Sequence, residues 1–296
     1  MFKTALHSVS YAGFWPGQAR LNLSDFLQRA STLGYDGVML MAKRPHLSLL
    51  DFDDAAIERL ADQLLELRLH VACLAAYTDF TIGSDHPEIP CREFQIATIT
   101  QLARLAERLK CPFIRVFTAY ERPTVSYDQT WMACVESLRE CARRVANFGV
   151  TLAVQNHHDM AAHFETMADL LEEIDHPHCK AAFDAWAPAL HGCDLVAGVD
   201  RLKDWIVHTT VADYVRRPRQ VYVPNIVNYT REPDAIRAVP MGEGFIDYRG
   251  FFAALRKIGY TGSVAYEMCS MLKGGGSEAN LNRYATAFLE WMRSIP

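Results

Sequence analysis

Hydrophobic and polar positions along this chain follow two alternating patterns. Short apolar runs, each typical of a buried strand, are followed by longer segments whose apolar residues recur at helical spacing. In one such segment Ile57, Leu60 and Leu64 fall on a single helical face, as expected for a helix packed on a core. Strand and helix patterns alternate in this way from one end of the chain to the other.

The boundaries follow from apolar runs, capping residues and glycines. The predicted strands are 2–11, 35–41, 69–77, 113–118, 149–158, 180–184, 205–212 and 263–267. The predicted helices are about 24–33, 53–67, 91–110, 127–147, 164–174, 195–202, 247–258 and 278–294. A long connection rich in Arg and Pro, about residues 214–244, separates the seventh strand from its helix.

Alternation of strands and helices predicts a parallel sheet with crossover helices. About 250 residues suffice for a closed (β/α)8 barrel, so this chain of 296 residues has room for long loops as well. We therefore predict an α/β fold, a (β/α)8 TIM barrel, as a single domain over 1–296 with an insertion at about 214–244. A doubly wound open sheet is the alternative, but its glycine-rich first turn is absent: only Gly13 and Gly17 stand there, with bulky residues between them.

The composition of the chain argues against some classes of binding partner. The chain is 50% hydrophobic and 22% charged, with a formal net charge of -5, and it has no basic run suited to nucleic acid. No apolar run approaches the roughly 20 residues of a membrane-spanning helix, and the N-terminus has no secretory pattern. Eight scattered cysteines form no CxxC pair, which indicates reduced thiols. We therefore expect a cytoplasmic protein that binds neither nucleic acid nor membrane.

Polar side chains gather where the predicted strands end. The fifth strand ends in Gln155 and His157, the sixth in Asp184, the seventh in His208 and Thr210, and the eighth in Glu267. In a barrel these ends converge on one site. Two carboxylates with an imidazole and an amide oxygen suit Mn²⁺, Co²⁺, Mg²⁺ or Zn²⁺. We predict a divalent metal, Mn²⁺ first, held by Gln155, Asp184, His208 and Glu267.

Several segments resemble the xylose-isomerase-like TIM-barrel superfamily, which includes sugar isomerases, ketose 3-epimerases, inosose dehydratases and endonuclease IV. The segments that carry the resemblance are 33–40, Phe183-Asp184, 242–248 and 259–267, the last ending in Glu267. The resemblance implies a metal-bound sugar or polyol substrate and removal of a proton next to a carbonyl through an enediolate. It also suggests a homo-oligomer.

The chain departs from that family at three strand ends. Gln155 stands where the epimerases carry a Glu, and an amide cannot act as a base. Thr210 stands where the family has a His, although His208 shares its face and could substitute. Met39 replaces a common Glu. We therefore expect Glu267 to be the catalytic base, with His157 or His158 as its partner.

These observations leave three hypotheses open. The first is a metal-dependent sugar isomerase or epimerase, the second is a lyase that eliminates water from a keto-sugar or inosose, and the third is a metal-free sugar-binding protein. An endonuclease-like role is disfavoured by the acidic charge. The connection 214–244 either covers the mouth of the barrel or forms a surface or oligomer contact. The predicted substrate-binding residues are Trp15, Asn156, Trp186 and Arg216.

Overall fold

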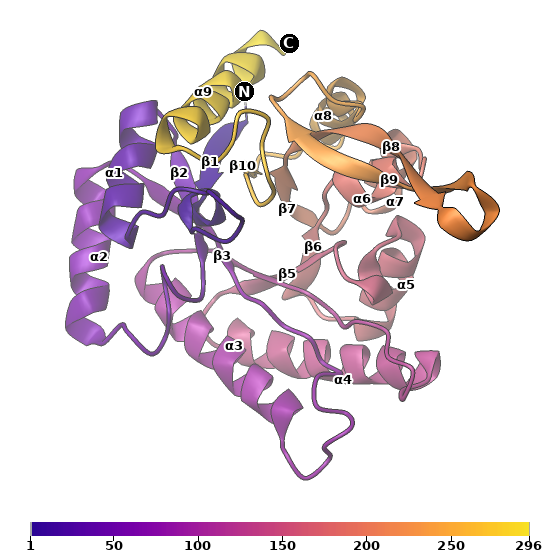
Figure 1. The fold of residues 1–296 in the computed structure, drawn as a ribbon. Helices are drawn as coiled ribbons and strands as arrows, with labels where there is room; N and C mark the ends of the chain where they lie inside the picture. The colour runs from indigo at the N-terminus through magenta and orange to yellow at the C-terminus, as the bar shows by residue number, and fades with distance from the viewer. Residues whose placement is uncertain (1, 296) are drawn as a thin grey trace.

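Eight parallel strands close into a barrel in the computed structural model, which describes residues 2–295 (Figure 1). The strands are β1 (Lys3–His7), β2 (Gly37–Met41), β3 (His70–Ala75), β4 (Phe113–Val116), β5 (Thr151–Gln155), β6 (Cys179–Ala182), β7 (Ile206–Val211) and β10 (Ser263–Tyr266). They lie in the order β1-β10-β7-β6-β5-β4-β3-β2 around the barrel. The predicted TIM barrel is confirmed.

Helices surround the barrel on its outside (Figure 1). They are α1 (Leu23–Leu33), α2 (Asp54–Glu66), α3 (Cys91–Arg108), α4 (Tyr127–Ala146), α5 (Phe164–Ile174), α6 (Trp186–Leu190), α7 (Leu195–Arg201), α8 (Tyr248–Lys257) and α9 (Glu278–Ser294). Local signals set their ends. In α1 the Asn22 side chain accepts a hydrogen bond from the Asp25 amide, and Gly34 ends the helix with φ +91°.

The barrel interior and the outer layer are filled by different residues. Inside, small or flexible side chains such as Ala5, Met39, Cys73 and Ala265 form a narrow buried cluster. Larger apolar side chains pack between the strands and the surrounding helices in one continuous core. Alternation along each strand produces this division, because successive side chains point to opposite faces. A polar side chain on the inner face at the C-terminal end of a strand therefore lies at the mouth of the barrel.

Two local elements differ from the prediction. The first strand is shorter than 2–11, because the His7 side chain accepts a hydrogen bond from the Val9 amide and residues Ser8–Tyr11 form a 3-10 turn. A short helix, α6, follows directly after the sixth strand and was not predicted. Its five residues include Pro188 and no polar cap, so it lacked the usual sequence signals.

The connection predicted at 214–244 is largely an antiparallel β-hairpin, not a loop. Its strands are β8 (Asp213–Val223) and β9 (Asn228–Val239). Pro218 and Pro233 weakened the strand pattern, because proline is normally excluded from paired strands. The structure places them where the pairing register shifts, between Arg217 and Arg219 and opposite that point. The hairpin points away from the barrel and does not close its mouth (Figure 1).

The remaining expectations about chain class concern membranes and cysteines. Within residues 2–295 no helix is both long enough and apolar enough to cross a membrane. The eight cysteines are free thiols, and most of them are buried, as predicted.

Candidate active site

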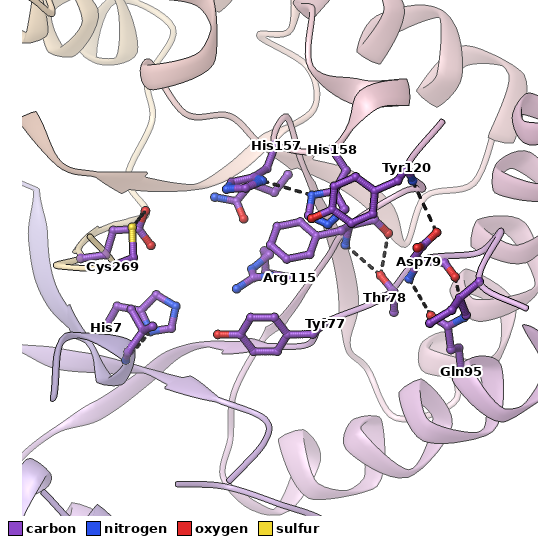
Figure 2. A pocket seen from close by; sticks show the side chains of 15 residues that line it. His7, Tyr77, Thr78, Asp79, Gln95, Arg115, Tyr120, His157, His158 and Cys269 are labelled. Carbon is purple, nitrogen blue, oxygen red and sulfur yellow. Dashed lines mark hydrogen bonds between the residues drawn. The ribbon is translucent and has the colours of Figure 1, made fainter. Parts of the chain in front are cut away.

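A cavity of about 580 Å³ lies at the C-terminal ends of the barrel strands (Figure 2). This is the face where active sites form in such barrels. Residues at or just after the ends of β1, β3, β4, β5 and β10 line the cavity. Its lining includes His7, Tyr77, Asp79, Arg115, Phe117, Tyr120, Gln155, His157, His158, Glu267 and Cys269.

Glu267 follows β10 and lies in the cavity wall. Burial raises the pKa of its carboxyl group to about 7, and the charge of Asp184 raises it further, while the positive charge of Arg115 opposes the shift. The Cys269 thiol lies 3.6 Å from one carboxylate oxygen. The other lining carboxylate, Asp79, is paired with Arg122 at 2.6 Å. Glu267 is therefore the lining carboxylate that is available as a base near neutral pH.

Asp184 is buried behind the cavity wall and is held by three donors. The Thr210 amide donates to Oδ1 at 2.6 Å, and the Thr210 hydroxyl and Gln155 Nε2 both donate to Oδ2. Gln155 Nε2 also donates to Thr210 Oγ1 at 2.9 Å. Burial raises the pKa of Asp184 to about 6, and the hydrogen bonds from Thr210 and Gln155 oppose that shift.

His208 takes no part in this network. Its Nε2 lies 3.4 Å from Sδ of Met39, on the second strand, and its ring is buried. Burial lowers the pKa of His208 to about 3, with a further contribution from the charge of Arg115. Thr210, two residues further along the same face, is the β7 side chain that contacts Asp184 and Gln155. The suggested role of His208 as a metal ligand stays a prediction.

The four predicted metal ligands thus fall into separate groups. Gln155 and Asp184 are hydrogen-bonded to each other. The charge of Asp184 raises the pKa of Glu267, and His208 faces Met39. In the described part of the chain, no group of three or more His, Cys, Asp and Glu side chains is placed to hold a metal ion. Amide and hydroxyl donors pointed at Asp184 do not fit a divalent ion there, because the ion needs those same oxygen atoms.

Arg115, on β4, is the cation of the cavity. It is 3% exposed; Nη1 donates to the carbonyl oxygen of Ala76 at 2.8 Å, and Nε has no hydrogen-bond partner within residues 2–295. The guanidinium carbon lies 4.0 Å from the ring centre of Phe117 and 4.9 Å from that of Tyr77. Figure 2 shows the guanidinium between His157 and Tyr77. A buried arginine held by rings and one carbonyl is suited to an anionic group of a ligand.

The two histidines after β5 form an aromatic wall. His158 lies between Phe117 and Tyr120, with ring centres 4.1 and 4.0 Å away. Nδ1 of His157 and Nδ1 of His158 are 3.1 Å apart. Burial lowers the pKa of each ring to about 4, and the neighbouring positive charge of Arg115 adds to the shift. Both rings are therefore neutral at neutral pH. Because one Nδ1–H donates to the other Nδ1, one of the two rings keeps an Nε2–H that it can offer to a substrate.

The four predicted substrate-binding residues lie outside the cavity lining. The side chain of Asn156 binds the backbone of Asp184. Its Nδ2 donates to the Asp184 carbonyl oxygen at 2.9 Å, and its Oδ1 accepts from the Asp184 backbone amide at 2.7 Å. Trp15 donates to the Met268 carbonyl oxygen at 3.1 Å. Trp186 stands behind His157, with ring centres 5.7 Å apart. Arg216 donates to the carbonyl oxygens of Ala189 and Leu190, at the end of α6.

Sequence reasoning had not singled out several residues that line the cavity or lie beside it. Arg115 carried the one visible signal, a charged residue inside the apolar run 113–118. Lys43 follows β2 and places its ammonium group 3.7 Å from the ring centre of Tyr77. His7, Phe117 and Tyr120 read as ordinary core or loop residues, and only the barrel geometry brings them to the cavity.

Curated proteins that match most of the chain are enzymes of two kinds. The chain is 24% identical to 3-dehydroshikimate dehydratase from Bacillus anthracis over 253 residues, which is 83% of this chain and 86% of that protein. It is 20% identical to fructoselysine 3-epimerase from Escherichia coli O157:H7 over 291 residues, 95% of this chain and 96% of that protein. These distant relatives indicate an epimerase-, isomerase- or dehydratase-like enzyme.

Solved structures agree in fold. D-psicose 3-epimerase with D-tagatose from Clostridium cellulolyticum H10 matches with a TM-score of 0.76 and 19% identity, over 99% of both chains. The probable 3-DHS dehydratase AsbF from Bacillus anthracis matches with a TM-score of 0.74 and 20% identity, over 100% of both chains. At such identities the likeness shows the fold alone. Residues 27–295 match the family described as xylose isomerase-like TIM barrel, and this chain belongs to that family.

Proposed function

We propose that this chain is a lyase that eliminates water from a small carbonyl compound carrying an anionic group. The observation that carries the proposal is the single available base: Glu267 faces the cavity, Asp79 is paired with Arg122, and the position across from Glu267 is the amide Gln155. Elimination next to a carbonyl needs one base, whereas the epimerisation implied by the resemblance uses a pair of carboxylates.

The cavity charges support an anionic substrate. Arg115 is buried at the wall, and Lys43 stands beside it over Tyr77. Burial and the charge of Arg115 lower the pKa of Lys43, so the two cations act on the same region. A carboxylate bound to Arg115 would replace the water that this guanidinium lost on folding, and charge-assisted hydrogen bonds of this kind are strong.

The chemistry requires a base, an electrophilic partner and a leaving group. Glu267 takes the proton from the carbon next to the carbonyl, and the electrons of that C–H bond form the new C=C bond. The C–O bond of the neighbouring carbon breaks, and the Glu267 carboxyl group returns the proton to the departing hydroxide as water. The neutral rings of His157 and His158 share one N–H between their Nδ1 atoms, and the ring that accepts this hydrogen bond can donate from Nε2 to a substrate oxygen.

The test is turnover with a panel of substrates: 3-dehydroshikimate, a keto-inositol, D-allulose and D-tagatose. Elimination from 3-dehydroshikimate gives a conjugated product with a new ultraviolet absorbance. Glu267→Gln should lower turnover by about 10²–10⁴-fold, because it removes the base while keeping the shape. Glu290→Gln, on the exposed face of α9, is the matched control and should leave turnover unchanged.

Epimerisation remains the second candidate, because the fructoselysine 3-epimerase relative matches 95% of the chain. It begins with the same proton removal and differs in the outcome. In D₂O an epimerase incorporates deuterium into a recovered sugar without loss of water, whereas a lyase accumulates the unsaturated product. Equal turnover of Glu267→Gln and wild type would contradict both.

A further inference from the structure

We infer that Arg115 takes the place of a divalent metal ion in this cavity: the strand ends present a fixed guanidinium charge and do not bind such an ion. The inference deepens the proposed function, in which Arg115 binds the anionic group of the substrate, and it rests on that proposal. It rests on the contacts of Asp184, on the chemistry of Gln155 and Thr210, and on the position of Arg115.

The Asp184 carboxylate already accepts three hydrogen bonds, which occupy three of its roughly four lone-pair sites. One oxygen accepts from the Thr210 amide, and the other accepts from the Thr210 hydroxyl and from Gln155 Nε2. The main chain of Asp184 is locked as well, because Asn156 bonds both its amide and its carbonyl oxygen. A metal ion at this carboxylate would have to compete with three donors for its oxygen atoms.

The neighbours of Asp184 are neutral. Gln155 offers at most one amide oxygen, and Thr210 offers a hydroxyl group, where a carboxylate and an imidazole would be strong ligands. His208 cannot compensate, because its Nε2 faces the Met39 thioether at 3.4 Å inside the barrel. Two carboxylates remain as charged candidate ligands, Asp184 and Glu267, and the first is already hydrogen-bonded by Thr210 and Gln155.

Arg115 supplies a positive charge near these two carboxylates. Its guanidinium lies in the cavity wall with Gln155 and Glu267, pressed against the Phe117 ring and backed by the Ala76 carbonyl oxygen. Figure 2 shows it facing across the cavity toward His7 and Cys269. A buried single charge repels a divalent cation brought close to it, since little water screens the two. The same guanidinium attracts the anionic group of the proposed substrate.

The experiment measures Mn²⁺ binding to the metal-stripped full chain, with free Mn²⁺ followed by electron paramagnetic resonance. Four proteins are compared: wild type, Gln155→Glu/Thr210→His, and that double variant with Arg115→Met or with Arg115→Lys. We expect no saturable site in wild type and about one ion per chain in the double variant. Arg115→Met should then tighten Mn²⁺ binding at least about tenfold, while Arg115→Lys, which keeps the charge, should not.

One saturable ion per wild-type chain, lost in Asp184→Asn, would overturn the inference. Equal Mn²⁺ affinity with Arg115 and with methionine at that position would overturn the role given to the guanidinium. Circular dichroism checks that each variant folds, and Gln155→Glu alone serves if the double variant does not. The readout needs no turnover, so a failure of the proposed lyase activity and a failure of this inference are seen separately.

Discussion

Arg115 influences the protonation of several titratable side chains in and near the cavity. Its charge lowers the pKa of His157, His158 and His208, in each case adding to the effect of burial. It also lowers the pKa of Glu267, but there it opposes burial and the charge of Asp184. The result is a set of neutral imidazoles around one carboxyl group that titrates near neutral pH.

This balance predicts the pH dependence of the reaction. Glu267 must be ionised to accept a proton, and its pKa is about 7, so kcat/KM should rise as pH increases through that value. Asp184→Asn removes a negative charge that raises this pKa, and the rising limb should move to lower pH. The measurement is a pH profile of kcat/KM for both proteins. A limb that stays in place in Asp184→Asn would contradict the coupling.

Asn156 is predicted to hold the backbone of Asp184 in position and to stabilise the folded protein. Asn156→Ala removes both hydrogen bonds to the buried backbone of Asp184 and leaves its amide and carbonyl without partners. The free energy of unfolding should fall by about 1–3 kcal/mol. Urea unfolding measures the change, with Gln101→Ala on the exposed face of α3 as a control that should cost little. Equal stability of Asn156→Ala and the control would contradict this role.

At the residue level, the polar residues at the strand ends could be predicted from the sequence, but the contacts between their side chains could not. Gln155 and Asp184 do meet, because their strands are neighbours and both residues fall near the C-terminal edge. His208 and Thr210 share a face, and only the three-dimensional arrangement shows that Thr210 is level with Asp184. The charge of Arg115 inside an apolar run was visible in the sequence, but its place in the site follows from barrel closure, which puts β4 opposite β10.

At the level of elements, the hairpin β8–β9 is an addition that the barrel does not require. Only its base is buried, at Asp213, Tyr214, Ala238 and Val239, and nearly all the rest is exposed. Its strands pair mainly with each other, and Tyr222 packs on Tyr229 with ring centres 5.3 Å apart. Periodicity predicted the barrel strands well because both their faces are buried, whereas this exposed hairpin has no apolar face to reveal it.

A protein with a shortened hairpin should therefore fold and keep its activity. Replacing residues 218–234 with Asn-Gly joins Arg217 to Ala235, which already pair in the hairpin, through a turn that favours tight hairpins. We expect the free energy of unfolding to change by less than about 1 kcal/mol and turnover to be retained, since no removed residue lines the cavity. Thermal unfolding and the lyase assay test this. A loss of turnover at unchanged stability would show that the hairpin contributes to the site.

At the level of the whole molecule, the barrel depends on joining its first and last strands. β1 pairs with β10 from Lys3 with Ser263 to Leu6 with Tyr266. α9 packs near this junction: the Tyr35 hydroxyl donates to the Ala285 carbonyl oxygen at 2.9 Å. Strand and helix patterns predict each unit separately, but the pairing of chain ends follows only from the number of units and the closed topology.

Phe288 is the side chain that tests this closure. It is fully buried and stacks on Tyr266 of β10 at 4.6 Å and on Tyr35, just before β2, at 6.2 Å between ring centres. Phe288→Ala should lower the free energy of unfolding by about 3–5 kcal/mol, because it leaves a cavity between the first and last units. Urea unfolding measures the loss, and Thr286→Ala, exposed on the same helix, should cost far less. A similar small change in both variants would mean that α9 packs on the barrel without holding its ends together.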